Sequence, residues 1–193
     1  MTPRIVAFDL ALAAAGIARS HNDYGEPGPY CRTVKPRTSG HERLHDLTVE
    51  VAAACRSEPH LAVIERPFIK MDTATVPLLG LHGIVTQWLW YQGIPYVYVS
   101  PMTRAVYATG DGKAGKEEVT RAVRLTYGHL LGGPSGVADH NAADATVLLC
   151  LALDAYGHAL AEVPDTQRRA TRSVVWPELR EVNRANATKF ADL

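Results

Sequence analysis

The 193-residue sequence has few cysteines, few aromatic residues and no net charge. Cys31, Cys55 and Cys150 lie far apart and form no C-x-x-C pair, which argues against a disulfide or zinc framework and predicts reduced, mostly buried thiols. The 20 basic residues are balanced by 20 acidic ones. This balance excludes a protein that coats nucleic acid by bulk charge, but it is compatible with a local basic face.

Long apolar runs are also missing. The longest, residues 143–155, is interrupted by Asp144 and Asp154 and is too short to cross a bilayer. The N-terminal MTPRIVAFDL does not resemble a signal peptide. We therefore expect no membrane association and a cytoplasmic location.

The length favours one main domain, which we place at residues 1–160, followed by an appendage at 161–193. From Gln167 onward the chain carries six basic residues and three acidic ones, so the appendage is mildly basic. Its role, DNA contact or simple disorder, stays open at this point.

The hydrophobic periodicity predicts an α/β domain of order β-β-β-α-β-α-β-α-α. Ser39 is expected to cap the first helix, with Glu42 completing a capping box. Three antiparallel strands followed by two strands entered through helical crossovers make a mixed five-stranded sheet flanked by helices. The expected strands are 4–10, 16–20, 30–34, 60–65 and 95–100, and the expected helices are 39–56, 75–92, 116–127 and a last one from 139, with a further helical pattern after Pro101.

Three carboxylates occupy similar places in this pattern. Asp9 ends the first strand, Glu65 ends the fourth, and Asp144 lies near the start of the last helix, each beside apolar residues. Burying an unpaired carboxylate costs several kcal/mol, so each should be paired, protonated or bound to a metal. Taken singly, Asp9 could be a turn residue, Glu65 a surface ion pair and Asp144 a structural hydrogen-bonding group.

The spacing around Asp144 adds further candidates. Asn141 and His140 precede it by three and four residues and share its helical face, whereas Asp139 suits the N-cap. Hard oxygen ligands without cysteine or paired histidine favour Mg²⁺ or Mn²⁺ over zinc. Two such ions roughly 3.5–4 Å apart can support phosphodiester hydrolysis.

Four stretches together resemble RuvC-type Holliday junction resolvases, which have the ribonuclease-H-like fold. FDLALAAAGIA, AVIERP and NAADATVLL resemble the three acidic motifs of that family, and YATGDGKAGKEEVTRAV resembles its Gly-x-Gly, lysine and helix segment. The resemblance covers about residues 4–157. It implies an endonuclease that resolves four-way junctions in branched DNA as a homodimer, with two Mg²⁺ ions per site that Mn²⁺ can replace.

The resemblance also assigns roles to residues. Asp9 would bridge both metals, with Glu65 and Asp144 as further ligands. The family's fourth position, an Asp or His, falls on Asn141, so Asn141, His140 and Asp139 all remain candidates there. Phe68 would stack on an unpaired base. Phosphate contacts would come from Lys116, extended by Lys113, Arg104 and Arg121.

Other interpretations remain open. A nuclease of the same fold could act on flaps or RNA/DNA hybrids, since fold does not determine substrate. A non-catalytic DNA-binding module of this fold is a further alternative, favoured by Asn141 where the family has an acid. A two-domain sugar-kinase-like ATPase needs a longer chain. The apolar face of the helix at 75–92 either forms a dimer contact or packs on the sheet, through Leu78, Leu81, Val85 and Leu89.

Overall fold

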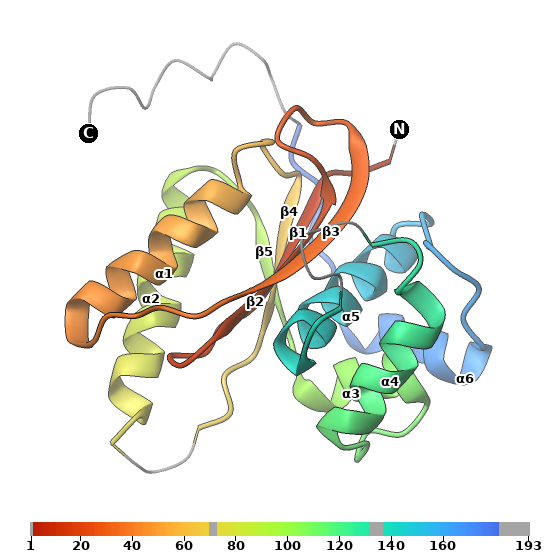
Figure 1. Ribbon diagram of the computed structural model, residues 1–193. Coiled ribbons are helices and arrows are strands. Elements are labelled where there is room, and N and C mark those ends of the chain that lie inside the picture. Colours follow the sequence, from red (N-terminus) through yellow and green to blue (C-terminus); the bar gives the residue numbers. More distant parts are fainter. Residues whose placement is uncertain (1, 70–72, 132–136, 182–193) are drawn as a thin grey trace.

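The computed structural model describes residues 2–69, 73–131 and 137–181 (Figure 1). Five strands and seven helical segments are found in these residues. The strands are β1 Ile5–Asp9, β2 Ala15–His21, β3 Pro27–Val34, β4 Leu61–Glu65 and β5 Tyr96–Val99. The helices are α1 Gly40–Ala54, α2 Thr75–Tyr91, α3 Pro101–Thr109, α4 Lys116–Tyr127, α5 His140–Ala155, the short α6 Asp165–Arg168 and the 3₁₀ helix η1 Arg169–Ser173.

The strands form one sheet in the order β3-β2-β1-β4-β5. The β1–β2 and β2–β3 pairs are antiparallel, whereas β1–β4 and β4–β5 are parallel. This is the predicted mixed sheet, and the prediction is confirmed. Because β1 and β4 are parallel neighbours, with Phe8 opposite Ile64, their carboxyl ends meet at one edge of the sheet.

Helices cover both faces of the sheet, with α1 and α2 on one side and α3, α4 and α5 on the other (Figure 1). Alternate residues of β1 serve the two cores: Ile5 and Ala7 belong to the core beneath α5, and Val6 and Phe8 to the core beneath α1 and α2. The second core also includes three residues from the predicted apolar face of α2, namely Leu81, Val85 and Leu89. That face therefore packs on the sheet.

The central helix α5 is buried at every position from Asn141 to Leu153. Asp139 is its N-cap, and a side-chain oxygen of Asp139 accepts hydrogen bonds from the backbone N–H groups of Asn141 and Ala142, both at 3.1 Å. The predicted cap is confirmed. Thr33 of β3 adds a hydroxyl that donates to the same oxygen at 2.5 Å. The helix start is thereby tied to the sheet.

The capping box predicted for α1 is wrong. Ser39 does precede the helix with an extended backbone, but its side chain makes no cap hydrogen bond. The nearby Thr38 hydroxyl instead donates to Asp46 at 2.6 Å, and the Thr38 carbonyl accepts from Arg43 Nε at 2.8 Å. These side-chain contacts hold the start of α1 in place of the predicted box.

The described part of the predicted appendage, up to residue 181, lies against the main domain. Arg180 donates to the carbonyl of Pro59 at 2.7 Å and to that of Gln92 at 3.0 Å. Residues 182–193 lie outside the described residues. The three cysteines are buried, as predicted, and none of them is joined in a disulfide. No helix within the described ranges has the length and apolar character needed to cross a membrane.

Candidate active site

Three carboxylates converge where β1, β4 and α5 meet. Asp9 is the last residue of β1, Glu65 the last of β4, and Asp144 lies in the second turn of α5. One carboxylate oxygen from each lies within 4.8 Å of the others. The parallel β1–β4 pair brings Asp9 and Glu65 together, and the packing of α5 across the sheet brings in Asp144.

Burial and mutual repulsion act on this cluster. Burial raises the pKa of Asp9 well above its usual value, and the negative charges of Glu65 and Asp144 raise it further. Burial also raises the pKa of Asp144 to about 7, although the Arg104 guanidinium partly opposes that shift. Crowded, poorly solvated carboxylates favour a bound cation, so the electrostatics match a metal site.

Arg104 occupies a different place from the one predicted. We expected it among the surface groups that contact DNA phosphate, but it is only 8% exposed and reaches into the carboxylate cluster from α3. Its Nε lies 3.2 Å from Glu65 Oε2, and its Nη1 forms an ion pair with Asp144. Arg104 shares the buried face of α3 with Tyr107, three residues on, which is the sequence signal that could have revealed this position.

The other cationic candidates lie outside the cluster. Lys113, Lys116 and Arg121 are exposed on α4 and the loop before it. Lys116 is close enough for its positive charge to oppose the upward shift in the pKa of both Asp9 and Asp144. Phe68 follows β4 and is 70% exposed. The structure therefore brings Lys116 near the carboxylates. It also exposes Phe68 to solvent in the segment that follows Glu65.

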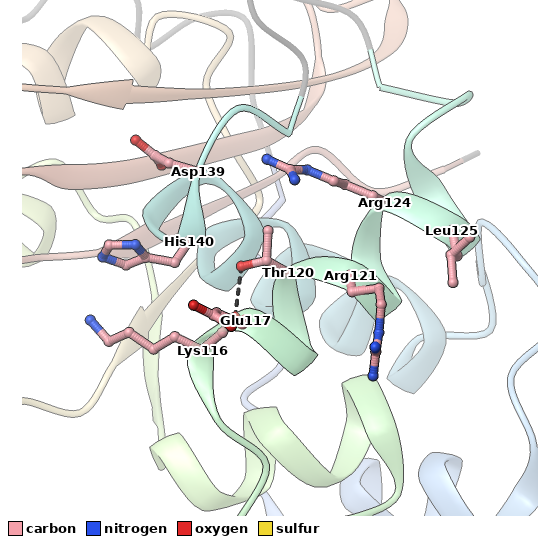
Figure 2. A pocket seen from close by; sticks show the side chains of 8 residues that line it. All are labelled: Lys116, Glu117, Thr120, Arg121, Arg124, Leu125, Asp139 and His140. Carbon is pink, nitrogen blue, oxygen red and sulfur yellow. Dashed lines mark hydrogen bonds between the residues drawn. The ribbon is translucent and has the colours of Figure 1, made fainter.

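A pocket of about 400 Å³ lies between α4 and the start of α5 (Figure 2). In Figure 2 the side chains of Lys116 and His140 extend toward the same side of it, whereas Arg121 and Leu125 point elsewhere. Arg124 anchors the segment before α5 by donating to the carbonyls of Val137 at 2.9 Å and Ala138 at 2.6 Å, a role that the sequence did not reveal. The lining residues are Lys116, Glu117, Thr120, Arg121, Arg124, Leu125, Asp139 and His140.

The three candidates for a fourth site residue lie in different surroundings. Asp139 is engaged as the helix cap. His140 lines the pocket and, within the described residues, is not one of the ligands grouped with the three carboxylates. Asn141 lies one turn before Asp144 and is 8% exposed. The geometry thus separates a pocket histidine from a buried asparagine.

Comparison with known proteins bears on this arrangement. No protein-family model matches the chain. A stretch of 93 residues is 32% identical to the crossover junction endodeoxyribonuclease RuvC of Synechococcus sp. (strain WH7803), and 103 residues are 33% identical to the RuvC of Gloeobacter violaceus. The chain is similar to RuvC. The two matches cover 48% and 53% of this chain, and 60% and 56% of those relatives.

Solved structures agree on the fold. The Thermus thermophilus RuvC in complex with Holliday junction substrate superposes with a TM-score of 0.61 at 22% identity, covering 84% of this chain and 99% of that one. The yeast mitochondrial Holliday junction resolvase Ydc2 superposes with a TM-score of 0.51 at 13% identity, covering 89% and 80%. The predicted ribonuclease-H-like fold is confirmed.

Proposed function

We propose that this chain is a metal-dependent endonuclease that cleaves phosphodiester bonds in branched DNA, with four-way junctions as its substrate. The observation that carries the proposal is the convergence of Asp9, Glu65 and Asp144, with Lys116 close by. Three acidic ligands beside an exposed cation suit a phosphodiester, which needs metal ions at the reacting phosphorus and a positive group on the flanking backbone. The similarity to RuvC supports the same activity.

The donor set fits a hard divalent cation. All three grouped ligands are carboxylates, their oxygens lie within 4.8 Å of one another, and burial makes their negative charge costly without a counter-ion. Asp9, Glu65 and Asp144 would hold Mg²⁺, for which Mn²⁺ can substitute, and we propose two ions per site during cleavage. Such ions supply an activated water and stabilise the leaving oxygen.

The protein's own residues would bind and orient the DNA. Lys116, Lys113 and Arg121 are exposed on α4 and the loop before it and would contact phosphates, which position a duplex without reading its sequence. Phe68 would stack on an unpaired base at the branch, a contact worth about 1–3 kcal/mol. Arg104 is buried and is not part of this surface.

For the fourth position we propose Asn141 as a metal ligand and His140 as a group that contacts the DNA. An amide oxygen can bind Mg²⁺ but cannot take up a proton, and Asn141 lies one turn from Asp144 on a buried helix start. Asn141→Ala should then weaken metal binding, whereas His140→Ala should leave metal affinity intact and slow cleavage. The opposite pattern would exchange the two roles.

The proposed functional unit is a homodimer. The outer face of α2 exposes Val76, Leu79 and Ile84, which are 78%, 42% and 43% exposed. This apolar stripe lies outside the buried residues of α2 that pack on the sheet and is suited to a second copy. A two-fold dimer would present one site to each of two strands of a four-way junction. Three buried thiols outside any disulfide fit a reducing compartment, so we place the enzyme in the cytoplasm.

The test uses an end-labelled four-way junction, the matched duplex, a flap and an RNA/DNA hybrid, each with Mg²⁺, Mn²⁺ or EDTA. Paired, symmetric nicks on the junction alone, lost with EDTA and in Asp9→Asn, are expected. Equal cutting of the plain duplex would reject the junction preference. Preferred cutting of the flap or hybrid would assign a different substrate on the same fold.

A non-catalytic DNA-binding module is the second candidate. One observation favours it: Arg104 pairs with two of the three carboxylates, and its positive charge lowers their attraction for a metal ion. The same experiment separates the two functions. Junction binding in a gel-shift assay, with no cleavage in Mg²⁺ or Mn²⁺, would support the binding module and reject the nuclease.

A further inference from the structure

Arg104 is placed in the carboxylate cluster by a well-defined helix start. Ser100 is the N-cap of α3, and its hydroxyl oxygen accepts from the backbone N–H of Thr103 at 3.0 Å. Pro101 occupies the first turn, where its missing N–H costs nothing. Arg104 follows on the face of α3 that is buried, together with Ala105 and Tyr107. Its guanidinium is therefore fixed at the site by the fold.

Arg104 adds a positive charge to the cluster, but its contacts leave carboxylate oxygens available to bind a metal ion. Its Nη1 pairs with Asp144, and its Nε lies 3.2 Å from Glu65 Oε2. The buried Nε–H nevertheless has no aligned hydrogen-bond acceptor among the described residues. Glu65 is thus held mainly by charge, and its oxygens keep lone pairs free for a cation. The guanidinium of an arginine carries a positive charge, and its planar shape lets it contact two carboxylates at once.

The charges at the site can be counted from these contacts. Asp9, Glu65 and Asp144, when ionised, contribute three negative charges, and Arg104 contributes one positive charge. The remaining two negative charges equal the charge of one divalent ion. A second ion would meet no net negative charge and would lie close to the guanidinium, in a poorly solvated site where such repulsion is weakly screened.

We propose that Arg104 is a built-in cation of this site, which limits the DNA-free protein to one firmly held divalent ion and leaves the second to enter with the DNA phosphate. The inference rests on the proposed metal site and adds the order in which the ions bind. The phosphodiester brings a negative charge of its own to the cluster, which restores attraction for another cation. Arg104 is a positioning residue in this scheme, because it acts through the carboxylates.

A purely structural ion pair would behave differently. If Arg104 only stabilised the fold, its replacement would lower stability and leave the number of bound ions unchanged. If it sets the charge of the site, replacing it by a neutral residue should admit a second ion without DNA. The number of ions bound therefore separates the two roles.

The test is a Mn²⁺ titration of the full chain at pH 8 without DNA, in which the electron paramagnetic resonance signal reports free Mn²⁺. The variants are Arg104→Gln, Arg104→Lys and, as a matched control, the exposed Arg37→Gln. We expect one tight ion in the wild type, Arg104→Lys and Arg37→Gln. Arg104→Gln should bind two ions, the first at least about tenfold more tightly than in the wild type. Addition of a junction with uncleavable linkages should raise the wild-type count to two.

Two ions of similar affinity in the DNA-free wild type would overturn the proposal, whatever the variants do. The same count and affinity in Arg104→Gln as in the wild type would also overturn it. If Arg104→Gln does not fold, as judged by circular dichroism, Arg104→Met takes its place, because it also removes the charge and keeps an unbranched side chain. Absence of any Mn²⁺ binding by the wild type would instead reject the metal site itself, and with it the proposed nuclease.

Discussion

The backbone carbonyl of Asn141 lies directly against Gly16. A Cβ atom at position 16 would be 2.0 Å from the Asn141 carbonyl oxygen and 2.6 Å from its carbon. Gly16 is also the residue paired with Asp9 across β1 and β2. The absence of a side chain at this one position therefore lets the start of α5 approach the sheet beside Asp9, which is what brings Asp144 into the cluster.

Gly16→Ala should disrupt both stability and the site. The added methyl meets backbone atoms, which cannot rotate away, so α5 must shift; we expect a loss of about 3 kcal/mol or more in the free energy of unfolding. Urea unfolding measures it, and Mn²⁺ affinity should fall in parallel. Gly80→Ala is the control. Gly80 lies within α2, and a Cβ atom there would meet only Leu44 Cδ1 of α1, at 4.0 Å. That variant should gain about 0.5–1 kcal/mol, and equal effects of the two would contradict the packing argument.

Asp9→Asn and Asp144→Asn should both raise stability when EDTA keeps metal away, and Asp9→Asn should do so by more. Asp9 has its pKa raised by burial and by two neighbouring carboxylates, so neutralising it relieves repulsion and should add about 1 kcal/mol to the free energy of unfolding at pH 8. Burial raises the pKa of Asp144 to about 7 although the Arg104 ion pair opposes that shift, so its charge is also costly at pH 8; Asp144→Asn should add stability too, but less, because it leaves the buried guanidinium with Glu65 alone. Denaturant unfolding of both variants beside the wild type gives the comparison. Destabilisation by Asp9→Asn would show that Asp9 is not under electrostatic strain.

Acid should weaken the fold through His60. His60 Nδ1 accepts the backbone N–H of Arg4 at 2.7 Å, and burial, followed by the charge of Arg4, lowers the pKa of His60 to about 4. In the unfolded chain the histidine has its ordinary pKa near 6.5, so between pH 6.5 and 4 the unfolded state binds the extra proton. The stabilisation is thus complete above pH 6.5 and is lost as the pH falls toward 4.

His60→Asn isolates that contribution, since the asparagine oxygen can accept the same hydrogen bond and does not titrate. Chemical unfolding at pH 7, 6 and 5 should show the wild type losing more stability than His60→Asn over this range. Parallel losses in the two proteins would assign the acid sensitivity to other groups, such as His21, whose pKa is also lowered, mainly by burial.

Some features of the fold and the site could be predicted from the sequence, and others could not. Strand order and the meeting of Asp9 with Glu65 follow from periodicity and from the parallel pairing that helical crossovers impose, so both could be predicted. Asp139 was identifiable as a cap because its bonds are local, reaching only two and three residues along the chain. Arg104 was misplaced because its partners are 39 and 40 residues away, and a charged residue on a helix is ordinarily assigned to solvent. Gly16 went unnoticed for a similar reason, since its constraint comes from Asn141.

Dimer formation through α2 should depend on its exposed apolar stripe. Ile84 is 43% exposed and lies on α2 beside the buried Leu81, so Ile84→Glu adds a charge to the proposed interface at a position outside the core. We expect this change to weaken self-association at least about tenfold, because a buried unpaired carboxylate is costly. Leu125→Glu is the matched control, since Leu125 is 77% exposed on α4, away from that stripe. Sedimentation velocity over a concentration series should show dimers for wild type and Leu125→Glu, and monomers for Ile84→Glu. Dimers that persist in Ile84→Glu, or that dissociate equally in both variants, would place the contact elsewhere. A wild type that is monomeric at every concentration would mean that two separate monomers bind the two cleavage sites of a junction.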